Sequence, residues 1–368
     1  MRILVTGGAG YIGSHMTRML LEHGYDVAVL DDLSTGFRDA VPEGLLVQAD
    51  IADRAALRRI FSAQAFDGVM HFAGLSQVGE SMARPGAYYR VNLAGTLALL
   101  EAMAEAGVRR LIQSSTAAIF GEPREALIDE HHPVRPLSPY GRAKWMVEEA
   151  LADYELAHEI RYACLRYFNA AGADPAGRLG ERHDPETHLI PLVLQVAAGK
   201  RPAIRVYGTD YDTRDGTCVR DYIHVEDLCR AHLLALERLL HGAGSARYNL
   251  GNGNGFSVKE VISTAAQVTG RRIPQVVAGR RPGDPARLVA NAAHARRELG
   301  WEPRYPALET IIAHAWNWEK RAIASPVRDM RPGINARNIS QADEISRLSP
   351  SGTEVAALTL SKQKAGRA

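Results

Sequence analysis

The sequence predicts an α/β protein with a doubly wound parallel sheet of the Rossmann type, a second, smaller α+β domain and a disordered C-terminal tail. Over the first 170 or so residues, short aliphatic runs alternate with longer segments of helical periodicity, which is the pattern of βαβ units. After Asn169 this rhythm stops, and Gly and Pro become frequent. We therefore expect a first domain at 1–169, a second mainly at 170–325 with some segments returning to the first, and a tail at 326–368.

The expected elements follow in chain order. Strands are expected at 2–6, 26–30, 45–48, 68–72, 110–114 and 162–166, and helices at 12–23, 54–63, 88–105 and 140–158. Strands buried on both faces of a parallel sheet are almost continuously apolar, as 68–72 is apart from His71. In the second part, we expect a strand at 203–207 and helices at 225–240 and 258–269.

The tail from Pro326 contains no aromatic residue and is rich in Ser, Arg and Pro. Such a segment cannot bury enough apolar area to offset the entropy lost on ordering, so we expect it to be disordered.

Composition excludes several classes of protein. With 46% hydrophobic and 23% charged residues, the 368-residue chain has the composition of a globular protein, not of a fibrous or fully disordered one. Its net charge of +2 gives no electrostatic reason to expect a nucleic acid or an anionic membrane as partner. The three cysteines are too irregularly spaced for a disulfide framework, and neither a secretory leader nor a long apolar run is present, so we expect a cytoplasmic protein.

A glycine-rich turn follows the first expected strand and opens the first expected helix. Gly7, Gly10 and Gly13 have the spacing of a dinucleotide fingerprint, and Tyr11 and Ile12 lie between the last two. Glycines let the backbone turn tightly and let a pyrophosphate approach the helix N-terminus. The alternative is a glycine-rich turn without a ligand.

Acidic residues end the second expected strand and follow the third. Asp31 and Asp32 can accept hydrogen bonds from adenosine ribose hydroxyls, and their charge would repel a 2′-phosphate, which favours NAD over NADP. The alternative for Asp31 is a solvated turn residue. Asp50 and Ile51 can hold the adenine, although helix capping by Asp50 or Asp53 is an alternative.

Tyr140 and Lys144 are four residues apart at the start of an expected helix, hence on one face and roughly 6 Å from each other. At an effective dielectric near ~20 that separation stabilises the phenolate by about 2.8 kcal/mol, which would lower the Tyr140 pKa by about two units. The pair is therefore a candidate general base with its supporting cation. The alternative is an interfacial Tyr and Lys on an amphipathic helix.

Ser114 and Thr116 lie at the carboxyl end of an expected parallel strand, where ligands bind in open α/β sheets. Thr116 can pass a proton between a substrate hydroxyl and Tyr140. Capping of the strand end is the alternative role.

With these motifs in place, roughly residues 1–320 resemble the extended short-chain dehydrogenase/reductase superfamily, and within it the UDP-glucose (UDP-galactose) 4-epimerase family. Besides the fingerprint, Thr116 and Tyr140/Lys144, the matching stretches are 72–74 (Phe-Ala-Gly), 78–81, 166–169, 216–225 and 280–284.

The resemblance implies a homodimer, a UDP-sugar substrate and tightly held NAD. It places Phe72, Ala73, Gly74, Asn92, Ser114, Lys144 and Tyr167 at the cofactor, and Thr116, Asn169, His188, Leu189, Arg205, Tyr207, Arg220, Arg281 and Asp284 at the nucleotide sugar. Of these, Arg220 and Arg281 would clamp the diphosphate and Asp284 would bind the uridine ribose. Without the resemblance, each arginine would be a surface ion-pair partner.

The chain departs from the family pattern at three positions. Ser76 stands where some relatives have Lys, which removes one contact to a cofactor phosphate. His188 stands where Asn is common, so imidazole must make that substrate contact. Leu288 replaces a wall residue that can be Tyr, which leaves room for N-acetylated sugars.

The activity implied is interconversion of UDP-galactose and UDP-glucose by oxidation and re-reduction at sugar C4, with a UDP-pentose or UDP-uronate 4-epimerase as alternative. Dehydratase and decarboxylase relatives carry acidic groups near the position of Ala117 and Ala118, and a non-catalytic NAD-binding regulator would have a broken Tyr-x-x-x-Lys motif. The helices around 94–106 and 146–154 are the expected dimer contact. The thirteen histidines, which include His131 and His132, show no metal-ligand spacing, so no metal is expected.

Overall fold

The computed structural model describes residues 1–281 and 284–324. The segment 1–325 forms one compact unit by its internal contacts. The expected tail at 326–368, and Pro282 and Gly283 of the motif at 280–284, lie outside the described residues.

A seven-stranded parallel sheet forms the centre of this unit, in the order β10-β6-β5-β4-β1-β2-β3. Its strands are β1 (Arg2–Thr6), β2 (Asp26–Asp31), β3 (Leu46–Gln48), β4 (Gly68–His71), β5 (Arg110–Thr116), β6 (Arg161–Tyr167) and β10 (Ala246–Leu250). The first six match the expected strands to within one or two residues at each end. The doubly wound α/β fold is confirmed.

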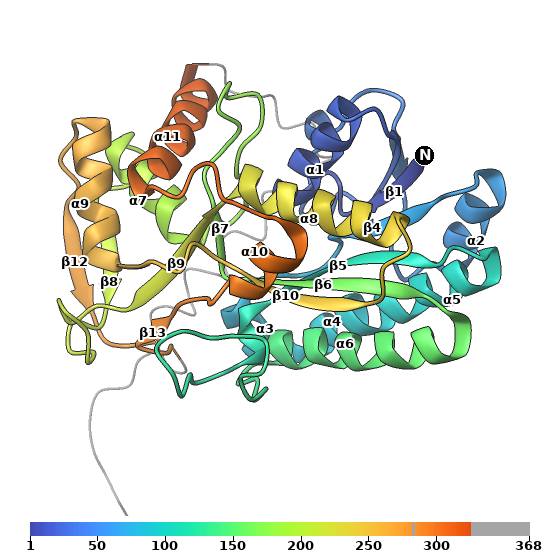
Figure 1. Cartoon of the computed structure of the whole chain (residues 1–368). Helices are drawn as coiled ribbons and strands as arrows, with labels where there is room; N and C mark the ends of the chain where they lie inside the picture. The colour runs from blue at the N-terminus through green and yellow to red at the C-terminus, as the bar shows by residue number, and fades with distance from the viewer. Residues whose placement is uncertain (282–283, 325–368) are drawn as a thin grey trace, which may run out of the picture. The chain divides into compact units, whose positions relative to one another are not determined.

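Helices cover both faces of the sheet (Figure 1). One face packs against α1 (Tyr11–Glu22), α8 (Val225–Leu240) and α10 (Ala293–Leu299) in one core cluster. The other packs against α2 (Arg54–Ala63), α5 (Thr96–Ala106) and α6 (Pro139–His158). Strand side chains alternate between the two clusters, since Ile3 and Val5 face the first and Leu4 the second.

The segment expected to be helical at 88–105 is helical throughout, but it is not one regular α-helix. The segment contains the end of a short helix, α4 (Pro85–Tyr88), a π-helical stretch (Tyr89–Gly95) and then α5. Another short helix, α3 (Val78–Ala83), precedes α4. Helical periodicity does not separate i→i+4 from i→i+5 hydrogen bonding over one turn, so the sequence pattern did not reveal the π-helical stretch.

The segments after residue 170 are divided between two places. Helix α8 and strand β10 complete the large sheet, where Tyr248 of β10 and Leu236 of α8 belong to the first core cluster. Helix α10 also packs on the large sheet, whereas a separate core is formed by α7 (Leu189–Ala197), α9 (Val258–Thr269) and α11 (Leu308–Ala324). Its strands are β7 (Asn169–Ala171), β8 (Ile204–Tyr207), β9 (Val219–His224), β11 (Gly255–Ser257), β12 (Gln275–Ala278) and β13 (Arg287–Leu288).

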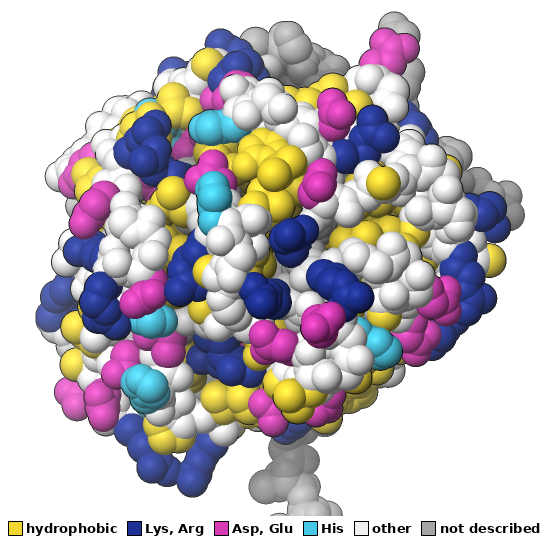
Figure 2. Space-filling view, turned by 45° about the vertical axis from the view of Figure 1, so that its right-hand side comes forward, with side chains coloured by type: hydrophobic (Ala, Val, Ile, Leu, Met, Phe, Trp, Pro, Cys, Tyr) yellow, Lys and Arg dark blue, Asp and Glu magenta, His cyan; other side chains and the backbone are white. Residues whose placement is uncertain are grey.

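Basic and acidic side chains are interspersed over the face shown in Figure 2, without a large patch of one sign. Among the described residues, no helix combines the length and the apolar character needed to cross a bilayer.

Candidate active site

A large cavity lies at the carboxyl end of the parallel sheet and has a volume of about 1590 Å³. Its wall includes residues at or just after the ends of β1, β2, β4, β5 and β6, represented by Gly7, Asp31, Phe72, Thr116 and Tyr167. Ligand sites for one small molecule are commonly ~300–1,000 Å³, so this cavity has room for two ligands side by side.

The fingerprint glycines are required by close backbone contacts. A Cβ on Gly13 would lie 2.1 Å from the Gly7 carbonyl oxygen, and one on Gly7, where φ is +72°, would lie 2.4 Å from the Ala73 nitrogen. Helix α1 has no side-chain cap at Gly10 and no acidic residue in its first turn. Its N-terminus, with Tyr11 and Ile12, therefore offers a dinucleotide pyrophosphate free backbone N–H groups at the cavity wall. These residues fit NAD.

Asp31 is not a solvated turn residue. Its side chain is buried, and its oxygens accept hydrogen bonds from the Ala9 nitrogen and the Leu33 nitrogen, both at 2.9 Å. Burial raises the pKa of Asp31, and the two backbone donors work in the opposite direction. Each oxygen keeps a lone pair for a ribose hydroxyl. Asp32, which also lines the cavity, accepts from the Ser34 nitrogen at 2.8 Å.

In the turn after β3, Ile51 lines the cavity, whereas Asp50 does not. The Asp50 carboxylate accepts a hydrogen bond from the Ala52 nitrogen at 2.8 Å, within its own turn. Asp53, not Asp50, caps helix α2 by accepting from the nitrogens of Ala55 and Ala56.

Asn92 lies behind the cavity wall. From the π-helical stretch, its amide donates to the Leu75 carbonyl oxygen and accepts from the Leu75 nitrogen, both at 2.8 Å. It thereby fixes the backbone beside Ala73 and Gly74, which line the cavity, as do Phe72 and Ser76.

The candidate catalytic group comes together through the start of α6. Ser138 caps this helix, and a Cβ on Gly141 would lie 2.5 Å from the Ala118 carbonyl oxygen, so the helix start packs against the turn after β5. This packing brings the Tyr140 hydroxyl into hydrogen-bond contact with Thr116. The side chains of Tyr140 and Thr116 are each 8% exposed and line the cavity.

The lowering of the Tyr140 pKa expected from Lys144 is not found with the protein's own groups alone, before the charge of a nicotinamide is added. Burial raises the pKa of Tyr140, while its hydrogen bond with Thr116 works against that rise. Lys144 donates instead to the Ser114 carbonyl oxygen at 2.9 Å, and burial lowers its pKa to about 8. The sequence argument counted only the attraction between the two groups, but removing a phenolate and an ammonium from water disfavours both charges.

Glu148 was not singled out from the sequence, although it continues the stripe of Tyr140 and Lys144 along α6. It is fully buried, and its carboxylate accepts from Ser115 Oγ at 2.6 Å and from the Arg166 guanidinium at 2.6 Å. This ion pair ties α6 to β5 and β6. The spacing of residues 140, 144 and 148 could have indicated it.

The expected substrate residues line the other half of the cavity. Arg220 forms an ion pair with Asp284 at 2.5 Å and is only 12% exposed, so it is not a surface arginine. The Arg281 guanidinium lies 3.8 Å from the ring centroid of Tyr207 and, through a hydrogen bond, lowers the pKa of that phenol. The remaining expected substrate residues that line this half are Asn169, His188, Leu189 and Arg205, together with Leu288.

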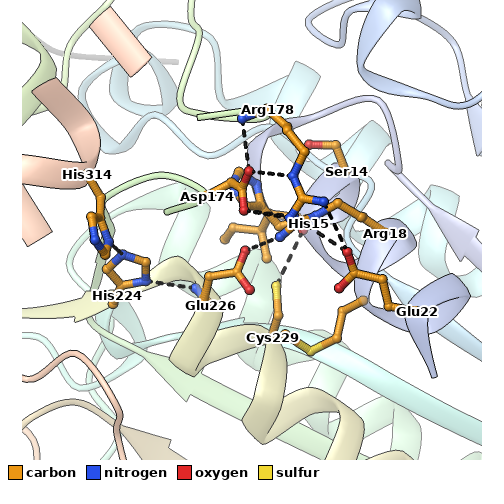
Figure 3. Close-up of polar contacts among 12 residues, drawn as sticks. Ser14, His15, Arg18, Glu22, Asp174, Arg178, His224, Glu226, Cys229 and His314 are labelled. Carbon is orange, nitrogen blue, oxygen red and sulfur yellow. Dashed lines mark hydrogen bonds and ion pairs between the residues drawn. The ribbon is translucent and has the colours of Figure 1, made fainter. Parts of the chain in front are cut away.

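An ion network centred on the buried Asp174 fixes the helix that carries the fingerprint (Figure 3). Arg18 of α1 bonds Asp174 at 2.7 Å and Glu226 of α8 at 2.5 Å, and Arg178 bonds Asp174 at 2.8 Å. Although burial disfavours the charge, these arginines hold the pKa of Asp174 well below its usual range. The network joins residues more than 150 positions apart, which no local pattern indicates.

The cavity wall also holds a histidine–glutamate group that sequence spacing did not indicate. One potential ligand atom each from Glu181, His183, Glu186 and His188 lies within 4.8 Å of the others. Although burial acts in the opposite direction, the Glu181 and Glu186 carboxylates raise the pKa of His188 to about 9. The pattern Glu-x-His-x-x-Glu-x-His could have revealed the group, had carboxylates been counted with histidines.

Residues 3–251 match the profile of the NAD dependent epimerase/dehydratase family. A UDP-glucose 4-epimerase of Halalkalibacterium halodurans is 52% identical over 320 residues, which are 87% of this chain and 96% of that protein. The crystal structure of a UDP-glucose 4-epimerase from Brucella ovis in complex with NAD is 47% identical, with a TM-score of 0.84 over 86% of this chain and 97% of that one. A UDP-Glc/GlcNAc 4-epimerase from Campylobacter jejuni is 42% identical, with a TM-score of 0.76 over 87% of this chain and 99% of that one.

Proposed function

The chain belongs to the NAD-dependent epimerase/dehydratase family, and from this premise we propose that it interconverts UDP-galactose and UDP-glucose by inverting sugar C4. The observation that carries this proposal is that one cavity holds the dinucleotide fingerprint, the Thr116–Tyr140–Lys144 group and the Arg220–Asp284 pair. Its relatives over most of its length are UDP-glucose 4-epimerases.

The residues of 1–169 hold the cofactor in this proposal. The α1 N-terminus binds the pyrophosphate, Asp31 binds the adenosine ribose, and Lys144 binds the second ribose. Bound NAD supplies the hydride acceptor for C4 and a positive charge next to the phenol. Arg18 keeps α1 in place through its buried contacts with Asp174 and Glu226.

Tyr140 is the general base. It removes the proton from the sugar O4, with Thr116 passing the proton, and returns it when the alcohol forms again. A catalytic proton acceptor must be able to hold the proton between the two steps. The phenol must be ionised before it can accept this proton; burial raises the pKa of Tyr140 and so disfavours the phenolate, and the positive charge of bound NAD would act in the opposite direction.

In this proposal the residues of 170–325 bind mainly the nucleotide part of the substrate and make few contacts with the sugar. Arg220 and Arg281 bind the diphosphate, Asp284 binds the uridine ribose, and Arg205 and Tyr207 lie at the uracil. The 4-keto sugar must turn so that its other face receives the hydride, so it can have few direct contacts. Strong anchoring of the nucleotide makes that turn possible without loss of the intermediate.

Ala117 and Ala118, which follow Thr116 and line the cavity, separate this function from dehydration and decarboxylation. Those reactions need a further acid or base beside the sugar, and an alanine cannot transfer a proton.

The test is to incubate the purified full-length protein with UDP-galactose, without added cofactor, and to measure UDP-glucose. We expect turnover by the unmodified protein and no measurable turnover by Tyr140→Phe, with NAD still bound to that variant. Tyr154→Phe, on the same helix, is the matched control and should keep full activity. Absence of turnover in the unmodified protein, or full activity of Tyr140→Phe, would contradict the proposal.

N-acetylated UDP-hexosamines are a second substrate class, favoured by Leu288 at the cavity wall. Leu288 pairs in register with Arg220, so its side chain is held close to the diphosphate-binding residue. Leu288→Tyr should reduce turnover of UDP-N-acetylgalactosamine by at least about tenfold relative to UDP-galactose. Lack of any N-acetylhexosamine turnover by the unmodified protein would remove this substrate class.

We also propose that the protein is a cytoplasmic homodimer. Helix α6 exposes Met146 at 44% and Leu156 at 87%, and a contact of α5 and α6 with the same helices of a second copy would cover such side chains. The three cysteines are free and buried, as in a protein from a reducing compartment. Light scattering of the purified protein tests the dimer, and a monomer mass at micromolar concentration would refute it.

A further inference from the structure

The group formed by Glu181, His183, Glu186 and His188 has the donor atoms and spacing of a metal site. His188 Nδ1 lies 2.5 Å from Glu181 Oε1 and 4.0 Å from Glu186 Oε1. His183 Nδ1 lies 3.4 Å from Glu181 Oε1 and 3.3 Å from Glu186 Oε2. Metal–ligand bonds of ~2.0–2.1 Å in a tetrahedron place neighbouring ligand atoms about 3.3 Å apart, which is within this range.

The two carboxylates of the group are buried and have histidines as their ionic partners. The side chains of Glu181 and Glu186 are each 5% exposed, and within the described part of the chain their ion pairs are with the two histidines only. Arg182, between them in sequence, is directed to Asp39 at 2.6 Å. Buried carboxylates in proteins are either paired with a cation or bound to a metal. A divalent cation bound by all four groups would balance the two negative charges with both imidazoles neutral.

The backbone around the group is held in place by contacts outside it. Gly180 packs against Trp318 of α11 so closely that a Cβ would lie 2.2 Å from the indole ring. The indole nitrogen of Trp318 donates to the Glu181 carbonyl oxygen at 3.2 Å. The Arg182 guanidinium covers the Phe37 ring at 4.0 Å. The four ligands are thus presented by a fixed segment, which reduces the entropy lost when an ion binds.

We propose that Glu181, His183, Glu186 and His188 bind one divalent transition-metal ion, with Zn²⁺ as the best match. Two imidazole nitrogens with two carboxylate oxygens suit Zn²⁺, whereas Mg²⁺ and Ca²⁺ prefer oxygen ligands alone. Four protein ligands leave no open position for water, so the ion is structural and not catalytic.

The position of the site gives the ion a role that goes beyond the proposed epimerase function. All four ligands line the cavity, directly before Leu189 and the start of α7. Coordination through His188 Nδ1 leaves Nε2 of the same ring for a contact in the cavity. The ion therefore fixes the edge of the cavity from which His188 and Leu189 reach the substrate.

Metal binding is tested on the full-length protein, independently of its activity. After treatment with a chelator and dialysis, the protein is titrated calorimetrically with Zn²⁺ and, separately, with Mg²⁺. We expect one Zn²⁺ per chain and no measurable heat from Mg²⁺ at the same concentrations. The double variant His183→Ala/Glu186→Gln should bind Zn²⁺ at least about 100-fold more weakly. The control His131→Ala/Glu125→Gln removes an exposed imidazole and an exposed carboxylate elsewhere and should bind as the unmodified protein does.

A spectroscopic measurement on the unmodified protein avoids dependence on the folding of the double variant. Co²⁺ added to the chelator-treated protein should give the intense visible absorption of a four-coordinate ion, and an equal amount of Zn²⁺ should abolish it. The proposal is overturned if the unmodified protein binds no Zn²⁺, if the double variant binds it as tightly as the control, or if Co²⁺ shows only the weak absorption of an octahedral ion. Epimerase activity without Zn²⁺ binding would refute the metal site alone, and Zn²⁺ binding without activity would refute the proposed function alone.

Discussion

Glu148→Gln tests how the catalytic helix is held against the sheet. Glu148 is fully buried one helical turn after Lys144, and its carboxylate accepts from Arg166 at 2.6 and 3.0 Å and from Ser115 at 2.6 Å. Arg247 adds a further bond at 3.1 Å. Glutamine keeps the shape of the side chain but removes the charge and turns one acceptor into a donor facing a guanidinium.

The expected loss follows from leaving a buried cation without its partner. Arg166 is 3% exposed, so water cannot replace the missing carboxylate. Breaking such a pair destabilises a protein by about 3–5 kcal/mol. For a chain of this size we expect a melting temperature lower by roughly 4–7 °C. Because α6 carries Tyr140 and Lys144, a small displacement should also reduce kcat by about 10- to 100-fold.

The assay is thermal unfolding followed by circular dichroism, together with kcat for UDP-galactose at a temperature at which the variant remains folded. Glu149→Gln is the matched control, because Glu149 is the exposed neighbour and the same charge is removed. If Glu148→Gln melts within about 1 °C of this control, the buried ion pair does not hold the helix and the argument fails.

Three further predictions concern the cofactor site. Gly13→Ala places a Cβ 2.1 Å from the Gly7 carbonyl oxygen and should yield protein without bound NAD, measured from the ratio of absorbance at 260 and 280 nm; retention of NAD as in a Gly86→Ala control would refute the close-contact argument. Asp31→Asn should reduce the preference for NAD over NADP by at least about tenfold, or ~1.4 kcal/mol, in calorimetric binding, because the carboxylate no longer repels a 2′-phosphate; an unchanged preference would show that another group selects the cofactor. Since burial lowers the Lys144 pKa to about 8 from 10.5, the native apo-protein loses this proton before the unfolded chain does, so this group makes stability rise with pH from 8 toward 10. The melting temperature of Lys144→Met should lack that rise, and parallel pH profiles of the two proteins would contradict the assignment.

Much of the cofactor half could be predicted from the sequence because its features are local. Parallel strands and amphipathic helices leave periodic patterns within a dozen residues. The spacing of Gly7, Gly10 and Gly13 is equally local, because close backbone contacts at the turn exclude side chains at these positions. The four-residue spacing of Tyr140 and Lys144 likewise follows from helix geometry alone. Sequence periodicity did not reveal the π-helical stretch before α5, because i→i+4 and i→i+5 hydrogen bonding leave similar side-chain patterns over one or two turns.

Several assignments that failed or were missed depend on desolvation and on partners far apart in the chain. The sequence could state that Lys144 lies near Tyr140, but only the packed structure decides that burial raises the pKa of the phenol and directs the ammonium to Ser114. The return of α8 and β10 to the large sheet and the ion network around Arg18 likewise join segments that no window along the sequence connects.

The sequence by itself thus determined most of the elements of the first 170 residues, the dinucleotide turn and the catalytic spacing, because each is fixed by backbone geometry over a few residues. Tertiary structure alone decided the protonation preferences and the pairing of Arg220 with Asp284. Those properties depend on how completely water is excluded and on which charges face each other after folding, and neither quantity exists before the chain has packed.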